Sequence, residues 1–333
     1  GVGKFGSGSA VSDSVHKALQ LYIYLYVTFY QKSMSAPNLQ TKANKMGIHL
    51  FLVLFFIGFT SPVYAQANAV EASIEFRNPN GLVKSLKPEE LNALTQQKTL
   101  KVFEVHEGRE RQYEIYPAQA VFDQVFGSGW RTADEIIFTC QDGYQPGIPV
   151  AKFLTYDAYL AVASADNTPF TLSNTLQNHE VVALGPAYLI WDNLKSPVLL
   201  DEGASDMPYQ IIRIELASFA ARFAGMFPPA GASAEARQGF LHFRKYCMAC
   251  HTINSQGGDK APELNYPVSV TEYFKPGYLK QWIDNPASLR YNTTMPALAA
   301  AIPEREKVIA EIIAYLTAMR DVKRMPPAEN NKP

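Results

Sequence analysis

Two cysteines and a histidine have the spacing of a covalent haem attachment site, in the stretch Cys247-Met248-Ala249-Cys250-His251. Thiols at this spacing can add to the two vinyl groups of a haem, and the imidazole that follows can bind its iron. The sequence therefore predicts one covalently bound haem c. Cys247 and Cys250 are the expected attachment residues, and His251 is the expected first axial ligand.

Three other interpretations of this motif are open. A redox-active dithiol needs a βαβ setting, which the flanking sequence does not provide. Half of a zinc site needs a second Cys/His pair at finger spacing, and none follows. A chance occurrence is opposed by an export signal, a suitably spaced methionine and helical flanks, so we favour haem c.

A methionine in a loop is the candidate for the second axial position of the iron. Met295 follows His251 in the sequence and stands between a short helix and the final predicted helix. Its thioether is a soft ligand, and a His/Met pair raises the potential of haem iron. A lone methionine is ordinarily core filler. The other candidates are less suitable: Met248 lies inside the motif, Met319 lies on a predicted core face, and Met325 lies in a polar tail. Met295 is therefore the expected distal ligand.

Helices are predicted on both sides of the motif. Ser233 can cap a helix over 234–246, whose apolar residues fall on one face and which ends at the motif. The stretch 253–265 contains Gly, Asp and Pro and predicts a loop. From Pro303 onward, apolar residues recur every three or four positions and predict a long final helix.

This C-terminal region, 234–320, resembles a class I cytochrome c domain. The matching residues are Gly239-Phe240, Gly257-Gly258, Pro262, Met295-Pro296 and Ile313-Ala314-Tyr315-Leu316. The resemblance implies a small all-α fold around one haem. It also implies that Gly239 and Tyr315 lie near the crossing of the first and last helices, and that Pro262 lies beside His251.

Short strand-like runs dominate the preceding region, 69–223. Alternating or short apolar runs bounded by Gly, Pro or Asp are typical of strands. The predicted strands are Ser73–Phe76, Leu100–Val105, Gln112–Tyr116, Glu135–Cys140, Tyr188–Trp191 and Gln210–Leu216. Helices are expected over Ala118–Phe126 and Tyr156–Ala163. The predicted class is α+β or mainly β.

This region resembles the sulfite-oxidase-like molybdopterin-binding fold, more weakly than the C-terminal region resembles a cytochrome. The matching stretches are Phe138–Tyr144, Ile148–Val150 and Leu184–Trp191. In enzymes of that fold the thiolate at the position of Cys140 binds molybdenum. Residues 66–232 hold 12 basic and 20 acidic residues, about −8 in net charge, which is the wrong sign for a phosphate-bearing cofactor. We therefore expect no molybdopterin and interpret Cys140 as a small buried residue.

The predicted organisation is two domains, an α+β or mainly β sulfite-oxidase-like domain (69–223) and an all-α cytochrome c domain (234–320). A Pro- and Gly-containing linker (224–233) joins them, and a flexible tail (321–333) follows. Residues 1–65 are interpreted as an upstream segment and a signal peptide. Lys42 and Lys45 precede an apolar run over 48–59, and cleavage is expected after Ala65, although an uncleaved anchor is the alternative.

Export agrees with the haem, because covalent haem attachment in bacteria occurs outside the cytoplasm. The expected location is the periplasm, with the protein soluble or loosely associated with the membrane. A formal net charge of −1 gives no tendency to bind polyanions such as nucleic acid.

With both axial positions filled by protein, we expect an electron carrier, not an enzyme, whose partners are redox proteins of a respiratory chain. The alternatives are a haem-linked molybdoenzyme using Cys140 and a gas sensor in which Met295 dissociates. Three interpretations are open for a group of four lysines, Lys245, Lys260, Lys275 and Lys280. They are ordinary surface residues, or they steer an acidic partner, or they pack against the acidic N-terminal region.

Overall fold

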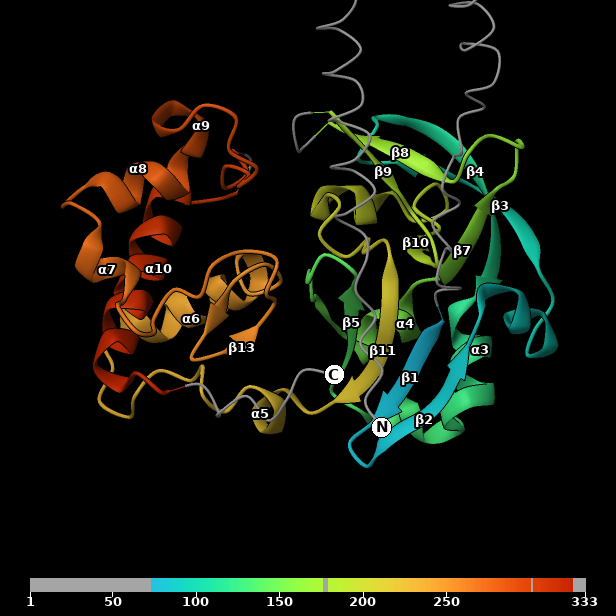
Figure 1. Cartoon of the computed structure of the whole chain (residues 1–333), viewed down its shortest axis with the longest axis horizontal. Coiled ribbons are helices and arrows are strands. Elements are labelled where there is room, and N and C mark those ends of the chain that lie inside the picture. Colours follow the sequence, from blue (N-terminus) through green and yellow to red (C-terminus); the bar gives the residue numbers. More distant parts are fainter. Residues whose placement is uncertain (1–72, 176–178, 301, 326–333) are drawn as a thin grey trace, which may run out of the picture. The chain divides into compact units, whose positions relative to one another are not determined.

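The computed structural model describes residues 73–175, 179–300 and 302–325 (Figure 1). The predicted signal peptide and its cleavage site after Ala65 lie outside these residues, as does the tail beyond 325. The described residues all belong to one compact unit of the chain, Ala69–Pro333.

Two β-sheets and two small hairpins make up the strands of this unit. The first sheet contains, in spatial order, β2 (Gly81–Leu86), β1 (Ile74–Asn78), β11 (Ile211–Ala217), β5 (Glu135–Cys140) and β6 (Gly147–Pro149). The second contains β10 (Tyr188–Trp191), β7 (Ala158–Ser164), β4 (Arg109–Pro117) and β3 (Lys98–Glu104). The hairpins are β8 (Thr171–Asn174) with β9 (Glu180–Ala183), and β12 (Thr252–Ile253) with β13 (Gln256–Gly257).

Only one described strand pair is parallel. β1 pairs in parallel with β11, with Phe76 opposite Ile214, and the other described strand pairs are antiparallel. β11 occupies the middle of the first sheet, between β1 and β5, although it is the last of that sheet's strands in the sequence. We call residues 73–217, which hold both sheets, the sheet segment.

Helices cover the sheets and form the C-terminal part of the unit. The helices of the sheet segment are α3 (Ala118–Phe126) and α4 (Val150–Thr155), with 3₁₀ helices η1 (Pro88–Ala93), η2 (Ser128–Thr132) and η3 (Pro197–Glu202). A short helix α5 (Phe219–Arg222) follows. Residues 234–322, here called the helical segment, contain α6 (Ala234–Tyr246), α7 (Val270–Tyr273), α8 (Tyr278–Asp284), α9 (Pro286–Leu289), α10 (Arg305–Met319) and η4 (Arg320–Val322).

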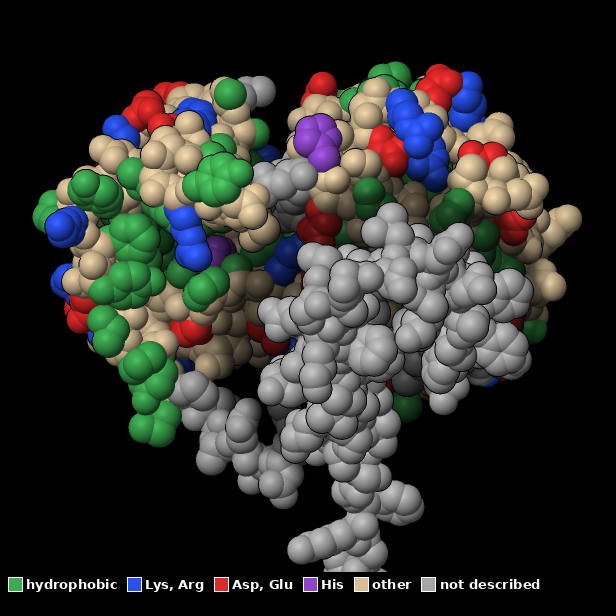
Figure 2. All heavy atoms as spheres, turned by 45° about the horizontal axis from the view of Figure 1, so that its top comes forward, with side chains coloured by type: hydrophobic (Ala, Val, Ile, Leu, Met, Phe, Trp, Pro, Cys, Tyr) green, Lys and Arg blue, Asp and Glu red, His purple; other side chains and the backbone are tan. Residues whose placement is uncertain are grey.

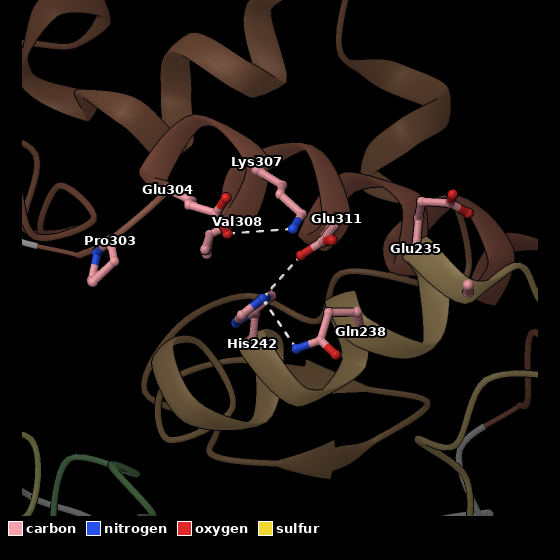
Figure 3. A pocket seen from close by; sticks show the side chains of 9 residues that line it. Glu235, Gln238, His242, Pro303, Glu304, Lys307, Val308 and Glu311 are labelled. Atoms are coloured by element: carbon pink, nitrogen blue, oxygen red, sulfur yellow. Dashed lines mark hydrogen bonds and ion pairs between the residues drawn. The ribbon is translucent and has the colours of Figure 1, made fainter.

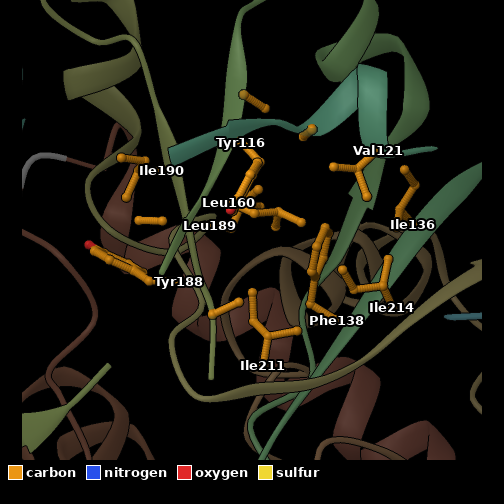
Figure 4. Packing of buried hydrophobic residues seen from close by; sticks show 14 of the residues in the cluster. Tyr116, Val121, Ile136, Phe138, Leu160, Tyr188, Leu189, Ile190, Ile211 and Ile214 are labelled. Atoms are coloured by element: carbon orange, nitrogen blue, oxygen red, sulfur yellow. The ribbon is translucent and has the colours of Figure 1, made fainter. Parts of the chain in front are cut away.

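The core of the sheet segment combines residues from both sheets and from α3, which contacts β2, β4 and β7. Figure 4 shows Ile136 and Phe138 of β5 near Ile214 of β11, with Leu160 of β7 in the same cluster. All four side chains are fully buried. Side chains on a strand alternate between its two faces, so Ile136 and Phe138 share one face of β5.

The intervening residue Ile137 is equally buried but belongs to a second hydrophobic cluster, the one centred on α6 and α10. The continuous apolar run of β5 is thus explained by burial on both faces. The second cluster also includes Ala217, Phe219, Phe223 and Met226, which precede the helical segment in the sequence.

The predicted division into two folds is therefore wrong. The described residues between 73 and 325 form one mixed α/β unit, 33% helix and 27% strand, without a separate all-α cytochrome domain. The helices share their hydrophobic cluster with β5 and α5, and the helical segment includes the hairpin β12–β13. Helical periodicity identified the apolar faces of α6 and α10 but carried no information about what covers them.

Polar contacts add to this shared cluster. Arg244 of α6 forms an ion pair with Glu135 of β5, whose side chain is only 4% exposed. The guanidinium of Arg244 also lies over the ring of Phe219, 3.7 Å from its centroid. The Tyr315 hydroxyl of α10 donates to the carbonyl of Met226 at 2.7 Å. Residues of the predicted linker are therefore packed against α10.

Candidate functional site

The Cys-x-x-Cys-His motif begins where α6 ends. Ser233 accepts a hydrogen bond from the Ala236 amide and caps α6 as predicted, and Cys247 is the C-terminal cap residue. The amides of Cys250 and His251 both donate to the carbonyl of Cys247, at 3.1 and 3.0 Å. This tight turn holds the two half-buried thiols and the imidazole within one short loop.

The His251 ring is oriented by its own backbone surroundings. Its Nδ1 lies 2.8 Å from the carbonyl oxygen of Pro262 and donates to it, which leaves Nε2 as the nitrogen able to bind a metal. The resemblance to class I cytochrome c domains implied this proximity of Pro262 to His251. Burial lowers the pKa of His251, which favours the neutral ring that ligation requires.

Burial raises the pKa of both thiols of the motif. Burial, together with the neighbouring Cys250, raises the pKa of Cys247 to about 12. Burial also raises the pKa of Cys250, while the charge of Lys260 opposes the rise. The residues present thus fit a covalently bound haem, with two free thiols beside a neutral imidazole that has one engaged nitrogen.

Two glycines let the following loop pass close to the motif. A Cβ on Gly258 would overlap the carbonyl of Ala249 and lie 3.2 Å from the amide of Cys250. Gly257 has a φ of +116° and faces the carbonyl of His251. These contacts explain why glycine occupies both positions behind the motif.

Met295 lies in the irregular stretch between α9 and α10, where its side chain is half-buried. Its amide donates to the hydroxyl of Thr293 at 3.3 Å. The assignment of Met295 as distal ligand stays a prediction, because no described contact joins Met295 to His251.

Cys140 lies at the end of β5 and is 3% exposed. Burial raises its pKa far above the usual value for a thiol, and nearby Asp142 adds to the rise. A buried thiol of this kind is poorly suited to binding a metal as a thiolate. The interpretation of Cys140 as a small buried residue agrees with this position.

A buried polar cluster in the sheet segment was not predicted as a unit. Glu104 is fully buried and accepts hydrogen bonds from the hydroxyls of Tyr113 and Tyr188, at 2.8 and 3.0 Å, while His106 Nδ1 lies 2.9 Å away. His106 Nδ1 also lies 3.3 Å from the hydroxyl of Tyr188, so this buried histidine has hydrogen-bond partners within the cluster. Since each group has partners, the cluster is a satisfied polar network.

A polar hollow of about 430 Å³ lies between α6 and α10 (Figure 3). His242 and Glu311 face each other across it, with Nε2 and Oε2 3.0 Å apart. The Cys motif does not line this hollow. Within the described ranges, no group of three or more His, Cys, Asp or Glu residues could hold a metal ion.

Hydrophobic side chains gather on one face of the helical segment (Figure 2). The exposed large hydrophobic residues of this segment are Leu241, Val268, Tyr273, Tyr278, Leu289 and Tyr291. Such gathering is typical of surfaces that meet another molecule.

None of the described helices has the length and apolar character needed to cross a membrane. No protein-family model matches the chain, and no curated protein is significantly similar to it. The two family resemblances therefore stay predictions.

Proposed function

We propose that this protein carries single electrons through a haem c held by Cys247, Cys250 and His251. The two thiols tether the porphyrin, and His251 Nε2 serves as the first axial ligand. When bound, the haem supplies one-electron chemistry between ferric and ferrous iron. With Met295 as second ligand no coordination position is left for a substrate, which favours an electron carrier over an enzyme.

The observation that carries this proposal is the hydrogen bond from His251 Nδ1 to Pro262 at 2.8 Å. A metal-binding histidine is ordinarily oriented in this way by a second partner on its other nitrogen. A redox dithiol would need neither the histidine nor this contact. The orientation of His251, next to two free thiols, therefore supports haem ligation.

The periplasm is the proposed location, because covalent haem attachment in bacteria takes place outside the cytoplasm. Redox proteins of a respiratory chain are the proposed partners. The exposed hydrophobic side chains of the helical segment support such contacts (Figure 2).

The test is expression with an export signal in a bacterial host able to mature haem c. We expect one haem per chain that acid-acetone does not extract, and reversible one-electron reduction. Cys247→Ser and Cys250→Ser together should abolish covalent attachment, whereas the matched variant Cys140→Ser should retain it. A colourless wild-type protein, or pigment extracted by acid-acetone, would overturn the proposal.

Two measurements on the same sample separate the alternatives. Carbon monoxide should not bind the reduced wild-type protein but should bind Met295→Ala, with Met325→Ala as the unaffected control. Binding to the wild type would favour a gas sensor. Stoichiometric molybdenum that is lost in Cys140→Ser would favour the haem-linked molybdoenzyme.

A further inference from the structure

The turn between β5 and β6, residues 141–146, lies directly against the loops around the Cys motif. The amide of Gln145 donates to the carbonyl of Ala249, inside the motif, at 2.7 Å. The amide of Asp259 donates to the carbonyl of Gly143 at 3.1 Å. This turn of the sheet segment therefore contacts the backbone of the motif and of the loop that follows it.

An ion pair accompanies these backbone contacts. Lys260 Nζ lies 2.7 Å from Asp142 Oδ2, and the two side chains are 24% and 32% exposed. The residue after Lys260 is bonded to the motif, since the Ala261 amide donates to the Cys250 carbonyl at 2.9 Å. The pair is thus held close to Cys250 by the main chain.

The pair lies beside the haem attachment residue Cys250, because the main chain next to Lys260 is bonded to Cys250 and the turn that carries Asp142 is bonded to Asp259. The two side chains carry opposite charges and therefore act in opposite directions on a charge that changes at the haem. Both are partly shielded from solvent, so water screens their charges less than those of fully exposed residues.

Gly143 permits this close approach. Its φ is +84°, and a Cβ at this position would lie 2.8 Å from the Lys260 amide. Any larger residue would push the turn away from the loop. The contact therefore depends on one residue of the sheet segment that the sequence pattern alone did not single out.

We propose that Lys260 and Asp142 form a charge pair that sets the reduction potential of the haem attached at Cys247 and Cys250. This inference rests on the proposed function. Oxidised haem carries one more positive charge than reduced haem, so the Lys260 ammonium disfavours oxidation and raises the potential. Asp142 partly neutralises Lys260 and lowers the potential. The sheet segment thereby adjusts the redox behaviour of a site in the helical segment.

The test is redox titration of three variants. Asp142→Asn should raise the potential, Lys260→Met should lower it, and the double variant should lie near the wild type. At low ionic strength each single change should shift the reduced-to-oxidised ratio at fixed solution potential roughly two- to tenfold. Lys280→Met, which removes an ion pair with Glu306 away from the turn, should leave the potential unchanged. Single variants that shift in the same direction, or not at all, would overturn the inference.

A second measurement follows the contact without haem. In the Cys247→Ser/Cys250→Ser protein, the amides of Gln145 and Asp259 should be protected from hydrogen exchange. Gly143→Ala should remove that protection but leave the amides of β7 unaffected. Unprotected amides in the parent would contradict the contact itself. A colourless wild type would remove both the function and this inference, whereas a pigmented protein with unmoved potentials would overturn the inference alone.

Discussion

Arg111 and Glu107 form an enclosed ion pair in the sheet segment, with side chains only 6% and 8% exposed. Arg111 Nη1 lies 3.0 Å from Glu107 Oε2, and the Ser173 amide donates to Oε1 of the same carboxylate at 2.9 Å. Burial by itself raises the pKa of Glu107, but the bonds from Ser173, Arg111 and Arg109 outweigh it. The pKa of Glu107 is therefore lowered.

Glu107→Gln should destabilise the protein by roughly 3 kcal/mol at pH 7, because it leaves Arg111 buried without its counter-charge. A carboxyl with a lowered native pKa stabilises the fold above its unfolded pKa of about 4.5, and that contribution is lost as pH falls through the native pKa. The stability difference between wild type and variant should therefore shrink as pH falls from about 5 toward 3.

Urea unfolding at several pH values measures this difference. Glu110→Gln is the matched control, because Glu110 pairs with Lys101 at the surface, where both side chains are about half exposed. The control should change stability little at any of these pH values. A Glu107→Gln difference that stays constant across the pH range would contradict the argument.

Among the elements, the crossing of α6 and α10 organises the helical segment. Gly239 of α6 meets the backbone of Glu311 and Ile312 in α10, and a Cβ on Gly239 would lie 3.0 Å from the Ile312 amide and overlap the Glu311 carbonyl. The rings of Phe240 and Phe243 contact Tyr315 at centroid distances of 5.5 and 5.3 Å. Close backbone approach thus brings these three aromatic rings together.

Gly239→Ala should destabilise the protein by about 1 to 3 kcal/mol, because the added methyl forces the two helices apart. Chemical denaturation followed by circular dichroism gives the change in free energy of unfolding. The control is Gly231→Ala, where a Cβ meets nothing within 4 Å. Equal effects of the two substitutions would show that the crossing does not require glycine.

At this scale much could be predicted from the sequence. Periodicity and a cap predicted α6 at its observed bounds, Ala234–Tyr246, and periodicity alone predicted α3 at Ala118–Phe126. The helix expected over Tyr156–Ala163 is wrong, since Ala158–Ser164 is the strand β7. β7 is paired on both edges and has buried residues on both faces, so its sequence lacks the alternation that marks a half-buried strand.

The candidate site could be predicted only in part, because local spacing is visible in the sequence whereas contacts between distant residues are not. The spacing of Cys247, Cys250 and His251 is local and can be seen directly in the sequence. The contact of Asp142 and Gly143 with Lys260 and Asp259 joins residues more than a hundred positions apart, and no local pattern encodes it. One interpretation of Lys260, packing against the acidic region, is confirmed by this ion pair.

At the scale of the whole molecule, Arg244 links the sheet and helical segments. It pairs with the nearly buried Glu135 and lies over Phe219, at the edge of the hydrophobic cluster that α6 shares with β5. We therefore expect the two segments to unfold together in a single transition, because they share one cluster.

Arg244→Met should destabilise the protein by roughly 3 to 5 kcal/mol, because Glu135 is left buried and unpaired. It should also separate the unfolding of the two segments. In a Trp282→Phe background, which removes the tryptophan of α8, Trp130 and Trp191 report on the sheet segment through fluorescence, while circular dichroism is dominated by the helices. Arg237→Met is the control, since Arg237 is exposed and donates to the carbonyl of Ala232 just before α6. Coincident transitions in Arg244→Met would argue against a linking role.

The position of β11 has a consequence for the order in which the first sheet can form during synthesis. β11 lies between β1 and β5 in the first sheet, yet its residues emerge more than a hundred positions after those of β1. Until residue 217 has emerged, β1 and β5 have no common neighbour, and the early chain presents two incomplete strand pairs. The Cys motif follows only thirty residues later. The first sheet, whose β5–β6 turn contacts the motif, can therefore be completed just before the motif itself is synthesised.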